Sequence, residues 1–162
     1  TEAIDNFQNI YEEKWLNMMR DKLGLFGKTK VDKKLIDDLL TWMEKNKADY
    51  TNTFCYLMNI KIGNNDLYND KNFINWSNDW QKRIFLNNNS KAKSLELMKN
   101  SNPIIIPRNH KVEEALIAAN EDNLEVMNRL LTILNKPYDE QNDIESYQYP
   151  LNDKNYKTFC GT

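Results

Sequence analysis

The sequence is poor in the residues on which many functional sites depend. Its 162 residues include 4 Gly, 4 Pro, a single histidine and two cysteines. So few glycines disfavour Gly-rich phosphate-binding loops and β-architectures with many tight turns. One histidine, without Cys-x-x-Cys or His-x-x-x-His spacing, excludes the common zinc motifs, and two cysteines cannot build a disulfide framework. Sparse cysteine is typical of a cytoplasmic protein, which is the localisation we expect.

Long apolar runs and an excess of one charge are also missing. No apolar segment approaches the roughly 20 residues of a membrane span, and no signal-peptide pattern appears. The net charge is −2, with +2 over residues 1–100 and −4 over residues 101–162. Neither half has the field of a nucleic-acid or membrane binder, so we expect neither partner. The chain begins with Thr1 rather than Met, and we expect it to be a processed or excised piece of a longer protein.

What is present is helical periodicity along most of the chain. Apolar residues recur at spacings of three and four, while no strand-like alternation rises above the background. Gly24 is expected to end the first helix with a positive φ. Thr29 with Asp32 resembles a capping box, and Asp49 is expected to cap the third helix. Six of the expected helices carry these apolar stripes: Ile4, Phe7, Tyr11, Trp15, Met18 and Met19; Leu35, Ile36, Leu39, Trp42 and Met43; Tyr50, Phe54, Leu57 and Met58; Phe73, Trp76, Trp80 and Ile84; Val112, Leu116 and Ala119; and Leu124, Met127, Leu130, Leu131 and Leu134. A further short helix is expected over residues 90–99.

These patterns predict an all-α fold of about seven helices in an orthogonal or irregular bundle. Residues 1–137 are expected to form a helical domain. Residues 138–162 are expected to form an extended C-terminal tail, because no helical period continues after Pro137. The tail is polar with spaced aromatic residues, so it either wraps a surface or is disordered.

The most distinctive stretch reads NPIIIPRNHKVEEAL and begins at Asn102. Two of its residues precede Pro103 and Pro107 and are therefore pushed out of the α region of backbone space. The stretch is expected to be extended, with its three isoleucines packed into the body of the protein. It is a candidate hinge between two helical layers.

Three polar residues follow the second proline. Arg108 is expected to hold a carboxylate or the carbonyl groups at a helix end. Asn109 is placed to cap the next helix. His110 has two interpretations: a polar residue at a helix start, or a catalytic base without an identifiable nucleophile. Two adjacent carboxylate pairs, at residues 37–38 and 113–114, point about 100° apart on their helices and are poorly placed to share a site.

Two further features invite a chemical interpretation. GLFGKT at residues 24–29 ends like a phosphate-binding loop, but Lys22 stands where the pattern needs glycine and a helix precedes it. We interpret this segment as a helix end followed by the next helix start. Cys55 lies beside an apolar stripe and is expected to be a core residue. Cys160 lies in the polar tail, where an exposed thiol is uncommon.

Several motifs, in order, resemble the C-terminal part of the selenoprotein O family. WLNMMRDKLGL is similar to that family's W-x-x-x-M-R-x-K-L-G-L, and DYTNTF to its D-Y-T-x-x-F. NPIIIPRNHKVEEAL is similar to N-P-x-x-I-P-R-N-H-x-V-E-x-A-L. LLTILNKPYDE matches the next block, and YKTFCGT resembles the family's C-terminus. The resemblance spans essentially the whole chain.

The resemblance implies a function for a longer parent protein. Members of the family are kinase-like adenylyltransferases that transfer AMP from ATP to Ser, Thr or Tyr hydroxyls of protein substrates, with magnesium. None of the family's catalytic, ATP-contacting or metal-binding residues matches a position here. The chain is therefore expected to be an inactive helical scaffold that binds no cofactor itself and whose partner is the kinase-like core of the parent chain.

The resemblance also implies a redox role for Cys160. The family has cysteine or selenocysteine third from its C-terminus, linked to a cysteine of the kinase-like core, and Cys160 stands at that place. An alternative from a different class stays open: a stand-alone helical protein-interaction module without enzymatic activity.

Overall fold

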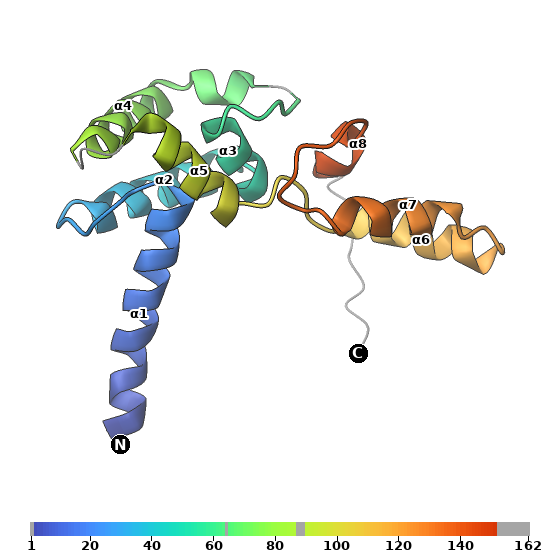
Figure 1. The fold of residues 1–162 in the computed structure, drawn as a ribbon, viewed down its shortest axis with the longest axis horizontal. Coiled ribbons are helices and arrows are strands. Elements are labelled where there is room, and N and C mark those ends of the chain that lie inside the picture. The colour runs from blue at the N-terminus through green and yellow to red at the C-terminus, as the bar shows by residue number, and fades with distance from the viewer. Residues whose placement is uncertain (1, 64, 87–89, 152–162) are drawn as a thin grey trace.

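A computed structural model of the chain describes residues 2–63, 65–86 and 90–151 (Figure 1). Over these residues the chain forms eight α-helices, one 3-10 helix and no strand, so the predicted all-α class is confirmed. No helix within these ranges is long and apolar enough to cross a membrane. The helices are α1 (Glu2–Lys22), α2 (Asp32–Asn46), α3 (Tyr50–Leu57), α4 (Lys71–Phe85), α5 (Lys91–Ser101), α6 (Asn109–Asn120), α7 (Glu125–Leu134) and α8 (Glu145–Gln148), with the 3-10 helix at Asp66–Asn69.

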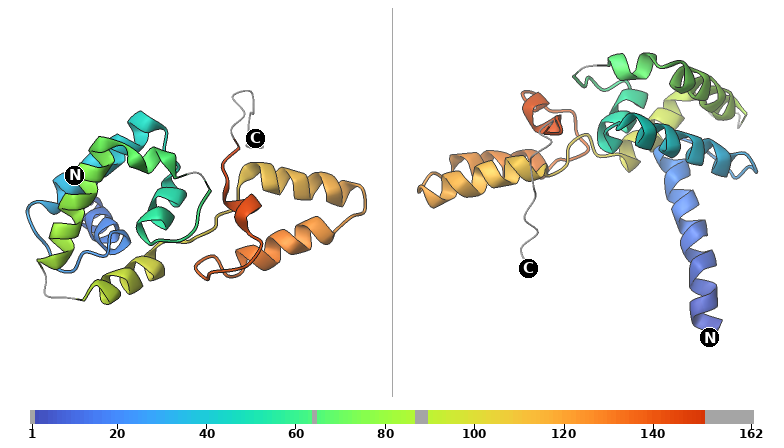
Figure 2. Two further views of the ribbon diagram at one scale, coloured as in Figure 1. Left: turned by 90° about the horizontal axis from the view of Figure 1, so that it is seen from above. Right: turned by 180° about the vertical axis from the view of Figure 1, so that it is seen from behind.

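The body of the protein is built from α2 to α5 and the C-terminal half of α1 (Figures 1 and 2). The predicted stripe of α4 is confirmed, because its four large apolar side chains are all buried, and α4 packs against α2 and α5. The indole N–H of Trp76 donates to the carbonyl of Leu35, and that of Trp80 donates to the carbonyl of Leu23. These bonds tie α4 to α2 and to the residue that follows α1.

Gly24 ends α1 in the way the sequence predicts. Its φ is +66°, in the left-handed region that favours glycine. Close packing is a second reason for glycine here. A Cβ at this position would lie 2.6 Å from the carbonyl oxygen of Ser94 in α5. The end of the first helix is therefore fixed both by local conformation and by a tertiary contact.

The predicted apolar stripe of α1 is only half correct. Met19 is buried and Trp15 packs against the core, but Phe7 and Tyr11 are 67% and 60% exposed. Met18 is exposed as well, and the side chain of Ile4 lies outside the described part of the structure. For Phe7 and Tyr11, Figures 1 and 2 show the reason: the N-terminal turns of α1 extend away from the other helices.

Other predicted inward-facing positions are also wrong. Tyr50 of α3 is exposed, while Phe54, Leu57 and Met58 behind it are buried as expected. In the α6–α7 hairpin, whose two helices pack against each other, the buried apolar residues are Ala115, Leu130 and Ile133, and only Leu130 belongs to the predicted stripe. The hairpin extends to one side of the body (Figure 1), so several apolar side chains remain at its surface: Leu116, Leu124 and Leu131.

The described part of the predicted tail, residues 138–151, lies along the start of the hairpin. It contains α8, which the sequence did not predict because a single turn has no detectable helical period. Ile144 and Gln148 are buried, and the Gln148 amide donates to the carbonyl of Ile104 at 3.1 Å. The connection between α3 and α4 likewise contains a short element, the 3-10 helix, whose Tyr68 is buried.

Candidate functional site

The stretch that begins at Asn102 leaves α5 in the extended conformation that its prolines predict. Asn102 has φ −124° and ψ 113°, and its side chain is buried. Its amide donates to the backbone carbonyls of Lys22 and Met98 at 2.9 and 2.8 Å, and it accepts from the Lys22 ammonium at 3.0 Å. Asn102 therefore joins the end of α1 to the end of α5. Both hydrogens of its amide are used within the protein, so it is a structural residue.

The isoleucines anchor this stretch in the core, as predicted. Ile104 and Ile105 are buried, and Ile106 is partly buried. The backbone N–H of Ile104 donates to the carbonyl of Pro137 at 2.8 Å. The segment between Pro103 and Pro107 is thus a buried, hydrogen-bonded connection between the body and the α6–α7 hairpin.

Arg108 holds three segments together. Its guanidinium donates to both carboxylate oxygens of Asp49, with N–O distances of 2.6 and 2.9 Å, and to the carbonyl of Gln148 at 2.8 Å. Asp49 is at the same time the N-cap of α3 and accepts from the backbone N–H of Asn52. The sequence predicted a carboxylate or a helix-end carbonyl for Arg108, and the structure provides both. The predicted cap by Asp49 is confirmed as well.

Asn109 does not have the predicted role. Arg108 occupies the cap position of α6, no side chain caps the helix, and Asn109 is its exposed first residue. The helix begins one residue earlier than predicted, because Arg108, held by its ion pair, has an extended φ and ψ. His110 is partly exposed and makes no hydrogen bond or ion pair with any described residue. Across the described ranges, no group of three His, Cys, Asp or Glu side chains could hold a metal ion.

Arg108 should therefore contribute more to stability than its two neighbours. Arg108→Lys keeps the charge but cannot form the two-pronged bond to Asp49, so we expect a loss of about 1.5–3 kcal/mol in the free energy of unfolding. Asn109→Ala and His110→Ala serve as controls and should change it by less than about 0.5 kcal/mol. Urea denaturation followed by circular dichroism measures all three. Equal effects in the three variants would show that the Arg108 network is not the anchor of the hinge.

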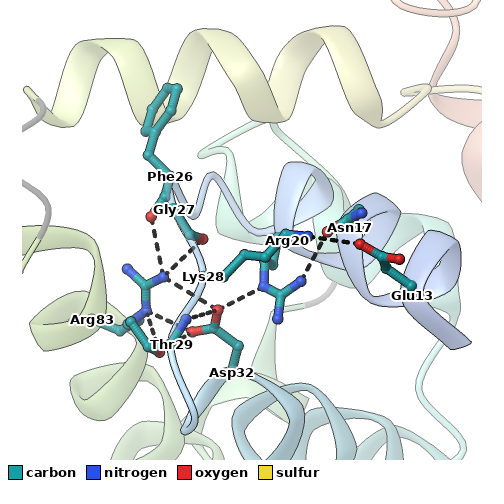
Figure 3. A network of polar contacts seen from close by, with 9 residues as sticks. All are labelled: Glu13, Asn17, Arg20, Phe26, Gly27, Lys28, Thr29, Asp32 and Arg83. Carbon is teal, nitrogen blue, oxygen red and sulfur yellow. Dashed lines mark hydrogen bonds and ion pairs between the residues drawn. The ribbon is translucent and has the colours of Figure 1, made fainter.

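A second polar network lies at the start of α2, and sequence reasoning missed it (Figure 3). Asp32 is completely buried and receives two guanidinium groups, from Arg20 of α1 and Arg83 of α4, each through Nε at 2.6 Å. The backbone N–H and hydroxyl of Thr29 donate to the same carboxylate at 2.9 and 2.5 Å. Only half of the predicted capping box forms, because the Thr29 hydroxyl bonds to this carboxylate instead of capping α2.

The cluster sets the charge state of Asp32. Burial acts to raise the pKa of its carboxyl, but the hydrogen bonds from Arg83, Thr29 and Arg20 outweigh burial and hold the pKa well below its usual range. The carboxylate is thus ionised and fully engaged at neutral pH. No sequence signal would have brought Arg20 and Arg83 to it, since 12 and 51 residues separate them from Asp32.

The same cluster shows how the GLFGKT segment, residues 24–29, differs from a phosphate-binding loop. Arg83 Nη2 donates to the carbonyls of Phe26 and Gly27 at 3.1 and 3.3 Å, so two carbonyl groups of this loop face a side chain of the protein (Figure 3). A phosphate cradle needs converging backbone N–H groups instead. Lys28 of this loop and Lys33 of α2 form exposed ion pairs with Glu13 and Glu12 of α1. This segment is a structural joint between α1, α2 and α4.

Of the two cysteines, the structure describes only Cys55. Cys55 is completely buried, as predicted for a core residue, and burial raises the pKa of its thiol to about 11. Cys160, the predicted redox residue, lies outside the described residues.

The fold and these networks define an all-α helical protein in which the distinctive polar residues join helices to one another. The sequence model of the family described as "Protein adenylyltransferase SelO" matches residues 1–135. The chain therefore belongs to the SelO protein adenylyltransferase family.

Similar curated proteins carry the name "Protein nucleotidyltransferase YdiU". The one from Pelagibacter ubique is 52% identical over an alignment of 164 residues, which covers 100% of this chain and 34% of that protein. Those from Alcanivorax borkumensis and Bacillus cereus are 44% and 46% identical, over 100% and 99% of this chain, and again over 34% of their own lengths. The chain thus spans about a third of the length of the relatives it matches.

Proposed function

We propose that this chain is the non-catalytic C-terminal helical region of a SelO-type protein adenylyltransferase. The observation that carries the proposal is that the distinctive polar residues of this chain bond to other parts of the same chain. Asn102 and Arg108, which stand in the motif most similar to the family's, bond to backbone carbonyls and to a helix-capping carboxylate. Asn102 joins the end of α1 to the end of α5, and Arg108 holds the start of α6 and α8 on the body, as a scaffold requires.

In this proposal the chemistry belongs to the parent protein. The parent transfers AMP from ATP, with magnesium, to Ser, Thr or Tyr hydroxyls of its protein substrates in the cytoplasm. Its kinase-like core supplies the phosphate cradle and metal ligands and is the main partner of the helical region. This region supports that core and takes no part in the transfer step.

The chain alone should neither bind Mg–ATP nor transfer AMP to protein. The expected calorimetric titration with Mg–ATP shows no saturable heat, and incubation with labelled ATP leaves protein unlabelled. A full-length chimera is the matched comparison: the Pelagibacter ubique relative, with its matching third replaced by this chain. It should label protein substrates. A micromolar dissociation constant for Mg–ATP on the chain alone would contradict the proposal.

A stand-alone interaction module is the second candidate, favoured by the exposed apolar side chains of the α6–α7 hairpin, among them Ile117 and Leu124. The gene distinguishes the two. A kinase-like coding region in frame upstream of Thr1 supports the scaffold, whereas a start codon there supports the module.

Cys160 is proposed to be a redox-regulatory residue of the parent. Oxidation would join its thiol and a thiol of the kinase-like core in a disulfide, with two electrons and two protons passing to a small disulfide such as oxidised glutathione. Support comes from the resemblance of YKTFCGT to the family's C-terminus and from the burial of Cys55, which removes the other cysteine as a competitor.

The two thiols should therefore react at very different rates. Cys55 is buried and mostly neutral at pH 8, so it should react with a chromogenic aromatic disulfide only after unfolding. Cys160 should react rapidly in the native chain. Comparison of Cys55→Ser with Cys160→Ser assigns the fast phase. Loss of the fast phase in Cys55→Ser, or a Cys160 thiol that stays reduced in the parent under oxidising conditions, would contradict the redox role.

A further inference from the structure

Helix α1 carries large apolar side chains that no described element covers. At about 100° per residue, Phe7, Ile10, Tyr11 and Met18 fall within roughly 100° of one another around the helix. All four are exposed, and the rings of Phe7 and Tyr11 are in contact, with centroids 6.3 Å apart. Trp15 and Met19, which face the body, lie roughly 80° and 120° from Phe7 around the helix, so Trp15 is only about 40° from Tyr11. The helix therefore has one broad apolar face, and the fold covers only the edge that carries Trp15 and Met19.

The uncovered face needs an explanation because it lies on a projecting helix. Figures 1 and 2 show these turns extending beyond the body, and the nearest described support is the pair of ion pairs from Glu12 and Glu13 to the start of α2. A short helical segment without tertiary packing is marginal in water. A group of large exposed apolar side chains on such a segment marks an interaction surface.

We propose that this face is covered, in the full-length protein, by the part of the longer family chain that lies outside the present region. This inference rests on the proposed function and names the surface through which the scaffold meets the rest of its parent. The relatives are matched over only 34% of their length, so about two thirds of a family chain is available to cover it. Lys14 lies within the stripe, so the covering surface is apolar with an acidic side chain opposite Lys14.

A second copy of this chain fits the face less well. The four side chains offer on the order of 400 Å², whereas a stable dimer buries roughly 800 Å² on each partner. A segment of the same polypeptide needs no such area, because covalent connection gives it a high effective concentration at the site. The size of the stripe therefore favours an intramolecular partner.

Hydrogen exchange in the chain alone and in the full-length chimera tests the inference. Backbone amides of residues 6–14 should exchange rapidly in the chain alone and at least about tenfold more slowly in the chimera. The double variant Phe7→Ala/Tyr11→Ala should remove most of that protection. Gln8→Ala/Asn9→Ala is the matched control on the same turns, outside the stripe, and should keep it. Alanine is a good helix former, so neither variant weakens the helix itself.

The outcomes separate this inference from the proposed function. Fast exchange of residues 6–14 in a chimera that still transfers AMP would overturn the inference and leave the scaffold role intact. Protection already present in the chain alone, together with a dimer in light scattering, would also overturn it in favour of a second copy. Binding of Mg–ATP by the chain alone would instead contradict the proposed function, whatever the exchange of α1.

Discussion

Replacement of Trp80 by alanine is expected to lower the free energy of unfolding by about 3–5 kcal/mol, through lost transfer energy and the cavity left behind. Trp80 is buried, its ring stacks on that of Trp76 with centroids 5.9 Å apart, and its indole N–H donates to the carbonyl of Leu23 at 2.9 Å. The loss of this donor leaves a buried carbonyl unpaired, which adds to the effect.

Two further variants separate these contributions. Trp80→Phe keeps an aromatic ring but removes the donor, so it should cost less than Trp80→Ala, about 1–3 kcal/mol. Phe85→Ala, on the same helix but 68% exposed, should change stability by less than about 0.5 kcal/mol. Far-ultraviolet circular dichroism during urea unfolding is the suitable measurement, since tryptophan fluorescence changes with the substitution. If Trp80→Ala is as mild as Phe85→Ala, α4 is not part of the core.

Asp32→Asn should be comparably destabilising. The substitution removes the one carboxylate that two buried guanidinium groups share, and breaking a buried ion pair from one side costs about 3–5 kcal/mol. Asp38→Asn, which breaks an exposed pair with Lys34, should cost less than about 1 kcal/mol. Should Asp32→Asn fail to fold, Thr29→Val removes the hydroxyl that donates to the same carboxylate and accepts from Arg83 Nε, and it should cost about 1–2 kcal/mol. Stability of Asp32→Asn equal to that of Asp38→Asn would contradict the cluster's role.

The same carboxylate predicts how stability depends on pH. The pKa of Asp32 is held well below its usual range in the folded state, while in the unfolded chain it is about 3.9. Its contribution is therefore fully present above about pH 4 and is lost as the pH falls from there toward the lower folded pKa. The stability difference between the wild type and Asp32→Asn should shrink below about pH 4, measured by urea unfolding across the acid range. A difference that stays constant down to pH 2 would contradict this linkage.

The sequence predicted the structure correctly at positions whose conformation depends on neighbouring residues in the chain. Glycine at position 24 ended a helix, Asp49 capped one, and the prolines at 103 and 107 kept a segment extended. The aromatic stripe of α4 was correctly assigned to the core, because four large apolar residues at helical spacing must be buried together. The family resemblance also came from the sequence, since several separated motifs stand in the family's order.

The prediction was wrong where a position's role depends on which neighbour is present. Asn109 has the chemistry of a cap, but Arg108, bonded to Asp49, occupies the cap position. Phe7 and Tyr11 fit an inward-facing stripe, but α1 extends beyond the body that would cover them. Periodicity shows that a helix has an apolar face, and it says nothing about which element covers that face.

The sequence by itself thus determined the all-α class, the main helices with many of their inner faces, the extended segment between Pro103 and Pro107 and the family, because each depends on residues near one another in the chain. The tertiary structure alone decided the Arg20–Asp32–Arg83 cluster, the partners of Arg108, the burial of α8 and the uncovered face of α1. The physical reason is that these features arise from contacts across tens of residues: Asp32 meets Arg83 across 51 positions and Arg108 meets Asp49 across 59. Such charged side chains can form an ion pair only after folding has brought their helices together.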